Sequence, residues 1–125
     1  MHELSVARNL VELIQREIRS GELPFVRTVS IRIGDLAGIV PESLEFCYKV
    51  VTDESPLAGS HLCFERIPFV VYCDHCRRSS HNPDGSMFCS HCSNAASSIV
   101  MGNELELTNI DVATPEEEHA WQRSP

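Results

Sequence analysis

The sequence predicts an α+β fold, in which two helices accompany a three-stranded sheet and a small four-cysteine zinc lobe is inserted. Three observations support this prediction: two segments with apolar residues at helical spacing, three segments typical of strands, and two closely spaced Cys-x-x-Cys pairs. We expect residues 1–69 and 103–114 to form the α+β domain, residues 70–102 the zinc-binding lobe, and residues 115–125 a flexible acidic tail.

Two segments are predicted to form amphipathic helices. In residues 3–20, apolar side chains recur every three or four residues, and Gly21 follows as a stop signal. A second helix is predicted to begin at Pro41, because proline suits the first turn of a helix. The apolar stripe of the first helix comprises Leu4, Ala7, Leu10, Val11, Ile14 and Ile18, and that of the second Leu44, Cys47, Tyr48 and Val51.

Three strands are predicted to complete the domain. Residues 25–33 alternate, with Val29, Ile31 and Ile33 on one side, and Gly34 ends the segment. Residues 61–67 form the second strand and residues 104–112 the third. The apolar positions of the third strand change phase midway, which predicts a β-bulge near Thr108-Asn109.

The four cysteines predict a metal site. Cys73 and Cys76 form one pair, twelve residues follow, and Cys89 and Cys92 form the other. Each pair can make a tight turn with both sulfurs facing one point, and four thiolates in a tetrahedron are the arrangement that Zn(II) prefers in a closed structural site. Such a site has no open position for catalysis, so the function must lie elsewhere. Pro68 and Gly102 mark the limits of this lobe, and the residues 82–85 between the pairs form a turn.

Composition excludes several classes of protein. The chain of 125 residues suits one domain with a small inserted lobe, and no stretch approaches the roughly 18 apolar residues of a membrane span. The start is polar and acidic, so we expect no secretory signal, a reducing cytoplasmic location, and cysteines that bind metal rather than form disulfides. The net charge of −8, with Arg77 and Arg78 as the only fixed cations of the lobe, argues against a nucleic-acid partner.

Catalytic motifs are lacking, so we expect no enzyme: the sequence has neither a nucleophile elbow nor a phosphate-binding glycine loop. Cys47 lies on the apolar stripe of the second helix and is expected to pack in the core; Cys63 also lies outside the pairs. Two rival interpretations stay open. A rubredoxin-like electron carrier would hold iron between the four sulfurs. A zinc-ribbon adaptor for protein or nucleic acid would need neither a free amino terminus nor His2.

The N-terminal residues Met1-His2 suggest a second kind of metal site. A free terminal amine, the next main-chain nitrogen and the His2 imidazole can close adjacent chelate rings around one ion, and planar nitrogen donors suit Ni(II) or Cu(II). Binding displaces protons, so such a site should loosen as the pH falls.

The chain resembles the HypA/HybF family, the nickel metallochaperones of nickel–iron hydrogenase maturation. The resemblance covers nearly the whole chain and rests on four segments: residues 1–5 (Met-His-Glu-Leu-Ser), residues 33–36 (Ile-Gly-Asp-Leu), residues 40–44 (Val-Pro-Glu-Ser-Leu), and both cysteine pairs in order. It implies Ni(II) as cargo, bound at the N-terminus by His2 and neighbouring main-chain nitrogens of Met1 and His2 with Glu3 close by, and structural Zn(II) on the four cysteines.

The resemblance also implies partners. It implies delivery of nickel to a hydrogenase large-subunit precursor together with a nickel-handling GTPase (HypB-like). It is also compatible with a homodimer and with a further role in the maturation of urease. One feature departs from the family pattern, because His75 and His91 lie inside the cysteine pairs rather than just beyond them. Two interpretations of these histidines stay open: pH-sensing or secondary nickel ligands, and plain exposed loop residues. His81, between the pairs, is a further candidate for a weak metal contact.

Overall fold

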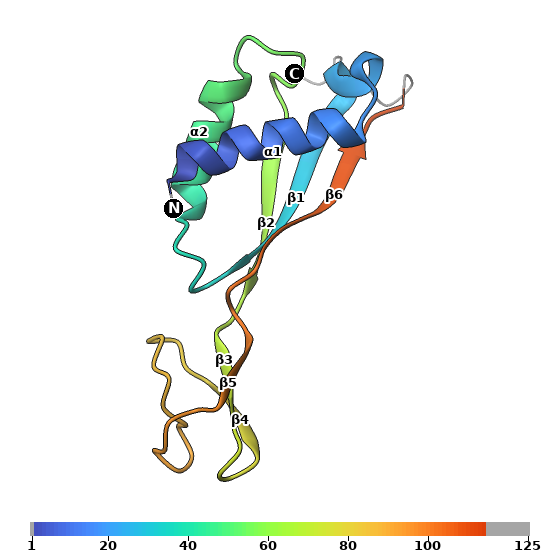
Figure 1. The fold of residues 1–125 in the computed structure, drawn as a ribbon. Coiled ribbons are helices and arrows are strands. Elements are labelled where there is room, and N and C mark those ends of the chain that lie inside the picture. Colours follow the sequence, from blue (N-terminus) through green and yellow to red (C-terminus); the bar gives the residue numbers. More distant parts are fainter. Residues whose placement is uncertain (1, 115–125) are drawn as a thin grey trace, which may run out of the picture. The chain divides into compact units, whose positions relative to one another are not determined.

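The computed structural model describes residues 2–114 of the chain. In chain order the elements are α1 (Glu3–Glu17), the 3-10 helix η1 (Ser20–Phe25), β1 (Val26–Gly34), α2 (Pro41–Thr52), β2 (His61–Ile67), β3 (Val70–Cys73), β4 (Arg78–His81), β5 (Ser98–Met101) and β6 (Leu105–Val112). The strands form two three-stranded sheets, ordered β2-β1-β6 and β4-β3-β5 (Figure 1). The predicted α+β class is confirmed. The second sheet was not predicted, because strands of four residues are too short to display a period of two.

The chain divides into two compact units, which we call the helical unit and the cysteine unit. The helical unit comprises Met1–Ile31, Ile39–Cys63 and Leu107–Pro125, and the cysteine unit comprises Arg32–Gly38 and Phe64–Glu106. Each has buried apolar side chains of its own. Those of the helical unit include Leu10, Ile14, Val29, Ile31, Leu44, Tyr48 and Leu57, and those of the cysteine unit Ile33, Ile67, Phe69, Val71, Cys73 and Cys89.

Helix α1 packs against α2 within the helical unit (Figure 1). It buries Val6, Ala7, Leu10 and Ile14. The predicted end at residue 20 is wrong, because Ile18 adopts an extended backbone and the 3-10 helix η1, which includes Gly21, follows. The predicted inward position of Leu4 is also wrong: its side chain is exposed, and Val6 is buried instead.

Helix α2 begins at Pro41, as predicted, and is fixed from its buried side. Leu44, Tyr48 and Thr52 are fully buried at intervals of four residues. The Tyr48 hydroxyl lies 2.7 Å from Ser60 Oγ, and the Thr52 hydroxyl donates to the Tyr48 carbonyl at 2.8 Å. Burial raises the pKa of Tyr48, so the phenol stays protonated and keeps this contact over the physiological range.

The first sheet agrees with the sequence pattern. Val29, Ile31 and Ile33 of β1 are buried as predicted, and β2 has the predicted bounds. Along β6 the alternation of exposure changes phase at Thr108-Asn109, which are both exposed. This change agrees with the predicted position of the bulge, which itself stays a prediction.

A close backbone crossing organises the cysteine unit. The amides of Gly34, Asp35 and Leu36 donate to the carbonyls of Glu104, Ile67 and Gly102, respectively. A Cβ atom on Gly34 would be placed directly on the Gly102 carbonyl. Gly102 itself has a φ of +118°, and a Cβ atom there would lie 2.6 Å from the Phe69 Cα. Only glycine therefore fits at either position.

Strand β3 is the centre of the second sheet. It pairs antiparallel with β4, with Val71 opposite Ser80 and Cys73 opposite Arg78, and antiparallel with β5, with Val71 opposite Ile99. All four residues of β5 are exposed. No helix within residues 2–114 combines the length and apolar character needed to cross a bilayer. The acidic tail predicted for residues 115–125 lies outside the described residues.

The close approach of the Gly34 and Gly102 backbones predicts that alanine destabilises the protein at Gly34 but not at Gly21. Gly34→Ala should lower the free energy of unfolding by about 1–3 kcal/mol, because the added methyl group overpacks the Gly102 backbone. Gly21→Ala is the matched control, since a Cβ atom there meets nothing within 4 Å, and should change stability by no more than about 0.5 kcal/mol. Chemical denaturation of the metal-loaded proteins measures both, and equal stability of the two variants would contradict the crossing.

Candidate metal centre

The first cysteine pair is the turn that joins β3 to β4. Cys73 ends β3 and is paired with Arg78, the first residue of β4. The Arg77 amide donates to the Cys73 carbonyl at 2.8 Å and closes the turn. Both cysteine side chains therefore project from a short antiparallel connection, which fixes their direction.

The second pair is closed in the same way. A bridge between Phe88 and Ala95 precedes and follows it, the Cys89 amide donates to the Asn94 carbonyl at 2.8 Å, and the Ser93 amide donates to the Cys89 carbonyl at 2.9 Å. The two turns thus share one design, in which the amide after the second cysteine bonds the carbonyl of the first.

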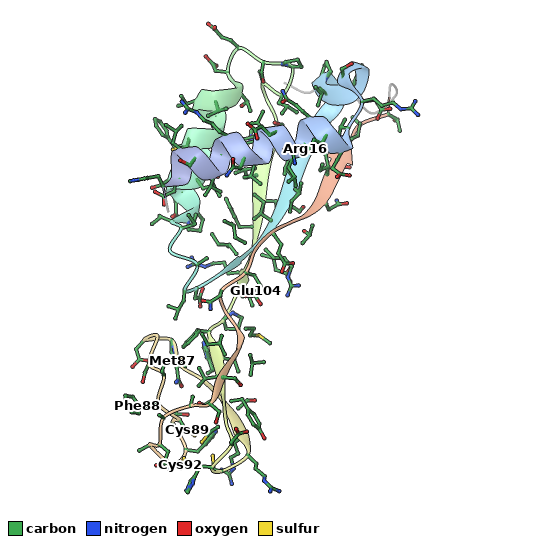
Figure 2. All side chains as sticks on the ribbon, in the orientation of Figure 1. Arg16, Met87, Phe88, Cys89, Cys92 and Glu104 are labelled. Carbon is green, nitrogen blue, oxygen red and sulfur yellow. The ribbon has the colours of Figure 1, made fainter. Side chains whose placement is uncertain are left out.

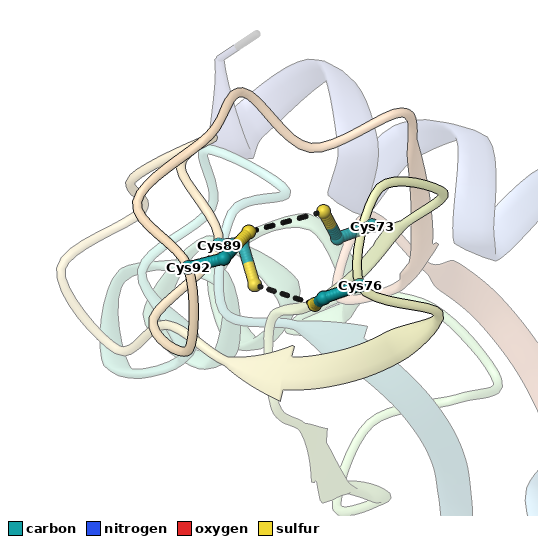
Figure 3. A group of neighbouring side chains, drawn as sticks. All are labelled: Cys73, Cys76, Cys89 and Cys92. Atoms are coloured by element: carbon teal, nitrogen blue, oxygen red, sulfur yellow. Dashed lines mark hydrogen bonds between the residues drawn. The ribbon is translucent and has the colours of Figure 1, made fainter.

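The four sulfurs converge on one point (Figure 3). Cys73 Sγ lies 3.6 Å from Cys92 Sγ, Cys76 Sγ lies 3.5 Å from Cys89 Sγ, and all four atoms lie within 4.8 Å of one another. A metal–sulfur bond of about 2.3 Å gives a tetrahedron with edges of about 3.8 Å. The sulfurs therefore need only small shifts to coordinate a single metal ion.

Backbone strain accompanies both turns. Arg77 has a φ of +58° and Ser93 a φ of +67°, and no other non-glycine residue of the described chain has a positive φ. Each directly follows the second cysteine of its pair. Side-chain-bearing residues adopt this region at some cost, so the local folding of each turn must be held by the contacts around it.

Desolvation and hydrogen bonds shift the pKa values of Cys76 and Cys92 in opposite directions. Main-chain and side-chain N–H groups of Asn94 lower the pKa of Cys92 to about 6. Desolvation, assisted by the thiol contact with Cys89, raises the pKa of Cys76 to about 12. A metal ion binds cysteine as the thiolate and must displace the thiol protons, so metal binding weakens as the pH falls.

Several polar residues that sequence analysis missed support the turns. Asn82 is buried, and its side-chain amide donates to the carbonyls of Ser86 and Phe88, both at 2.7 Å. Ser80 Oγ accepts from the Ser90 amide, and Ser97 Oγ accepts from the Asp74 amide. The sequence offered one signal for Asn82, the Asn-Pro-Asp-Gly turn motif at residues 82–85. This turn is present as predicted, because the Gly85 amide donates to the Asn82 carbonyl.

The histidines lie outside the sulfur cluster. His75, His81 and His91 are exposed, and the one group of metal-binding side chains found in residues 2–114 consists of the four cysteines alone. The His91 ring lies 3.2 Å from the Ser79 carbonyl, so it links the second turn to β4. Cys63 is exposed on β2 and Cys47 is half-buried on α2. Met87 and Phe88, just before Cys89, also carry exposed side chains (Figure 2).

Two of the predicted nickel ligands, His2 and Glu3, lie in the helical unit. His2 precedes α1 with an extended backbone (φ −84°, ψ 135°), is exposed, and makes no side-chain capping hydrogen bond. Its carbonyl accepts from the Val6 amide at 3.2 Å. Glu3 is half-buried in the first turn of α1, and Met1 lies outside the described residues.

Comparison with known sequences gives one consistent family. A family model described as "HypA: Hydrogenase/urease nickel incorporation, metallochaperone, hypA" matches residues 1–112. A "Hydrogenase maturation factor HypA" from Desulfatibacillum aliphaticivorans is 36% identical over 118 residues, which cover 94% of this chain and 91% of the relative. One from Chloroflexus aggregans is 34% identical over 112 residues, covering 89% and 98%.

Solved structures share the fold. The solution structure of the Ni metallochaperone HypA from Helicobacter pylori aligns with a TM-score of 0.62 and 20% identity, covering 90% of this chain and 97% of that one. A second solution structure, of a HypA protein, aligns with a TM-score of 0.64 over the same shares.

The strained backbone at Ser93 predicts a specific substitution pattern. Ser93→Gly should hold Zn(II) at least as tightly as the unaltered protein, whereas Ser93→Val should weaken binding by about tenfold, because a β-branched residue is poorly tolerated at positive φ. Competition with a chromogenic chelator measures both. Ser90→Val, one position after a cysteine but without a positive φ, is the control and should bind normally; equal affinities of Ser93→Val and Ser90→Val would refute the role of strain.

Proposed function

Since this chain belongs to the HypA family of nickel-incorporation metallochaperones, we propose that it binds Ni(II) at its N-terminus and delivers the ion for maturation of a nickel–iron hydrogenase. The observation that carries the proposal is the extent of the family match. It runs from residue 1 to residue 112 and so includes both the Met-His-Glu start and the four cysteines. The names of the relatives, hydrogenase maturation factors, support hydrogenase as the recipient.

In the proposed nickel site, His2 supplies its imidazole and main-chain nitrogen, Met1 its amine, and Glu3 a nearby carboxylate. The exposed, uncapped position of His2 supports this assignment, because the ring is accessible to an ion from solvent. The N-terminal end of a helix carries a partial positive charge, which opposes a bound cation, and the Glu3 carboxylate offsets that repulsion. Such a balance between repulsion by the helix dipole and attraction by the Glu3 carboxylate suits an ion that must be released again.

The four cysteines are proposed to hold structural Zn(II). Four thiolates fill a tetrahedral zinc site and leave no position for water or substrate. A segment with so few buried apolar side chains gains much of its folding free energy from such a metal. Zinc therefore has a resident role and nickel a transient one.

The proposed partners are a nickel-handling GTPase (HypB-like) and the hydrogenase large-subunit precursor. The protein itself is proposed to be non-enzymatic, because a closed four-sulfur site offers no group for catalysis. The proposed location is the reducing cytoplasm, where cysteines persist as metal-binding thiolates.

The identity of the resident metal is tested by metal analysis of the purified protein. We expect one zinc per chain and a colourless solution, whereas iron would give the coloured protein of an electron carrier. Cys76→Ser should lose the metal and unfold the cysteine unit, while Cys63→Ser, an exposed cysteine outside the cluster, should retain both. Retention of zinc by Cys76→Ser would contradict the assignment.

The nickel site is tested by calorimetric titration of Ni(II) into zinc-loaded protein. We expect one tightly bound nickel per chain, lost in His2→Ala while zinc stays bound, because the variant lacks the imidazole donor. His61→Ala, which removes another exposed histidine of the helical unit, should bind nickel normally.

A second variant tests the amine. A single glycine added before Met1 should also weaken nickel binding, since it moves the terminal amine away from His2. Equal nickel binding by the unaltered protein, His2→Ala and the extended protein would remove the N-terminal site and favour a zinc-ribbon adaptor without a specific nickel site.

A further inference from the structure

The outward face of α2 carries two apolar side chains in solvent. Phe46 is 69% exposed and Val50 57%. Their spacing of four residues places them next to each other on one face of the helix, whereas Leu44 and Tyr48 are fully buried on the other. Two large apolar side chains this exposed on a firmly packed helix indicate a surface for interaction.

Exposed acids stand at both ends of this pair. Glu42 lies one turn before Phe46, and Asp53 and Glu54 follow Val50 by three and four residues. Glu42 is favourable at a helix N-terminus, but Asp53 and Glu54 lie at the C-terminal end, where the helix dipole disfavours negative charge. Helix stability therefore does not account for these two acids.

The cation of this helix does not neutralise the acids. Lys49 is the lysine of α2, and its ammonium group lies 3.5 Å from the Glu45 carboxylate, one turn earlier on the same helix. Glu42, Asp53 and Glu54 thus leave a net negative rim around Phe46 and Val50. A surface that complements it needs an apolar pocket with lysine or arginine around it.

We propose that Glu42, Phe46, Val50, Asp53 and Glu54 form a docking face on α2 for a protein partner in nickel transfer, whose own surface offers an apolar pocket ringed by lysine and arginine. The identity of the partner rests on the proposed function, whereas the location of the face rests on the exposure and charge of α2. Phe46 is the anchor, since aromatic side chains fill such pockets with little loss of conformational freedom.

The position of α2 suits such a role. The helix is held by the Tyr48–Ser60 contact and by packing on α1, so Phe46 is presented on a rigid element. Helix α1, whose first turn directly follows His2, packs against α2 within the helical unit (Figure 1). A partner bound to the docking face would therefore be held against the unit that carries the proposed nickel ligands.

The test is a binding titration with purified partners. The nickel-handling GTPase and the hydrogenase large-subunit precursor are titrated separately into zinc-loaded protein, into Phe46→Ser and into Val50→Ser. We expect at least one partner to bind, and Phe46→Ser to weaken its affinity by tenfold or more, as removal of an aromatic anchor does. Leu13→Ser is the matched control, because Leu13 is an exposed apolar residue of α1, and should bind like the unaltered protein.

A charge variant tests the rim separately. The double variant Asp53→Asn, Glu54→Gln should slow association and reduce its dependence on salt concentration, because long-range attraction to a basic partner is lost. Thermal melting of every variant checks that the fold is kept, as expected for exposed positions.

Three results would overturn the docking face. These are binding of neither partner, binding that Phe46→Ser leaves unchanged, and concentration-dependent self-association that Phe46→Ser abolishes, which would make a second copy of this chain the occupant. Nickel stoichiometry is measured on the same samples. If Phe46→Ser loses the partner while His2→Ala keeps its nickel, the docking face stands and the N-terminal nickel site fails.

Discussion

Contact between the Gly34 and Gly102 backbones is the constraint on which the cysteine unit depends. The chain leaves β2 at Ile67, returns at Gly102, and passes the end of β1 so closely that Gly34 cannot carry a methyl group. Gly102 cannot carry one either, because its φ is positive and a Cβ atom there would meet Phe69. Three main-chain hydrogen bonds from residues 34–36 then join the outgoing and returning segments. The domain tolerates the inserted segment between Ile67 and Gly102 because the two ends of the segment are held together before the metal-binding turns begin.

Beyond the crossing, the two proposed metal sites differ in the way they are built. The sulfur cluster draws its four ligands from two closed turns, each held by main-chain hydrogen bonds, so losing the ion means rearranging a folded unit. The proposed nickel ligands come from consecutive residues at the start of α1, where the His2 side chain makes no capping hydrogen bond that release would have to break. The closed site thus suits the proposed structural zinc, and the open site suits the proposed nickel cargo.

Much of this architecture was predictable from residue patterns, and the failures have physical reasons. Periodicity identified both helices and the three longer strands, and the cysteine spacing identified the ligands that the structure brings together. Periodicity could not reveal β3, β4 and β5, because these strands are too short to show an alternation of apolar and polar residues. Their pairing follows from the cysteine turns instead. Nor could it distinguish Val6 from Leu4, since both positions suit an apolar stripe and only the folded structure shows that Val6 is buried and Leu4 exposed. Asn82 and Asn94 support the turns through side-chain hydrogen bonds, which residue spacing does not predict.

Strand β5 has a consequence for the solubility of the protein. It is an edge strand of the second sheet, its four residues are exposed, and residues 95–102 carry no charged side chain. Natural edge strands usually carry lysine or proline that discourages pairing with other chains, and β5 has neither. In the folded protein the short strand is paired with β3 in its own sheet. We expect a chain produced without enough metal for the four cysteines to expose this segment to neighbouring chains, so that aggregation depends on the metal supply during synthesis.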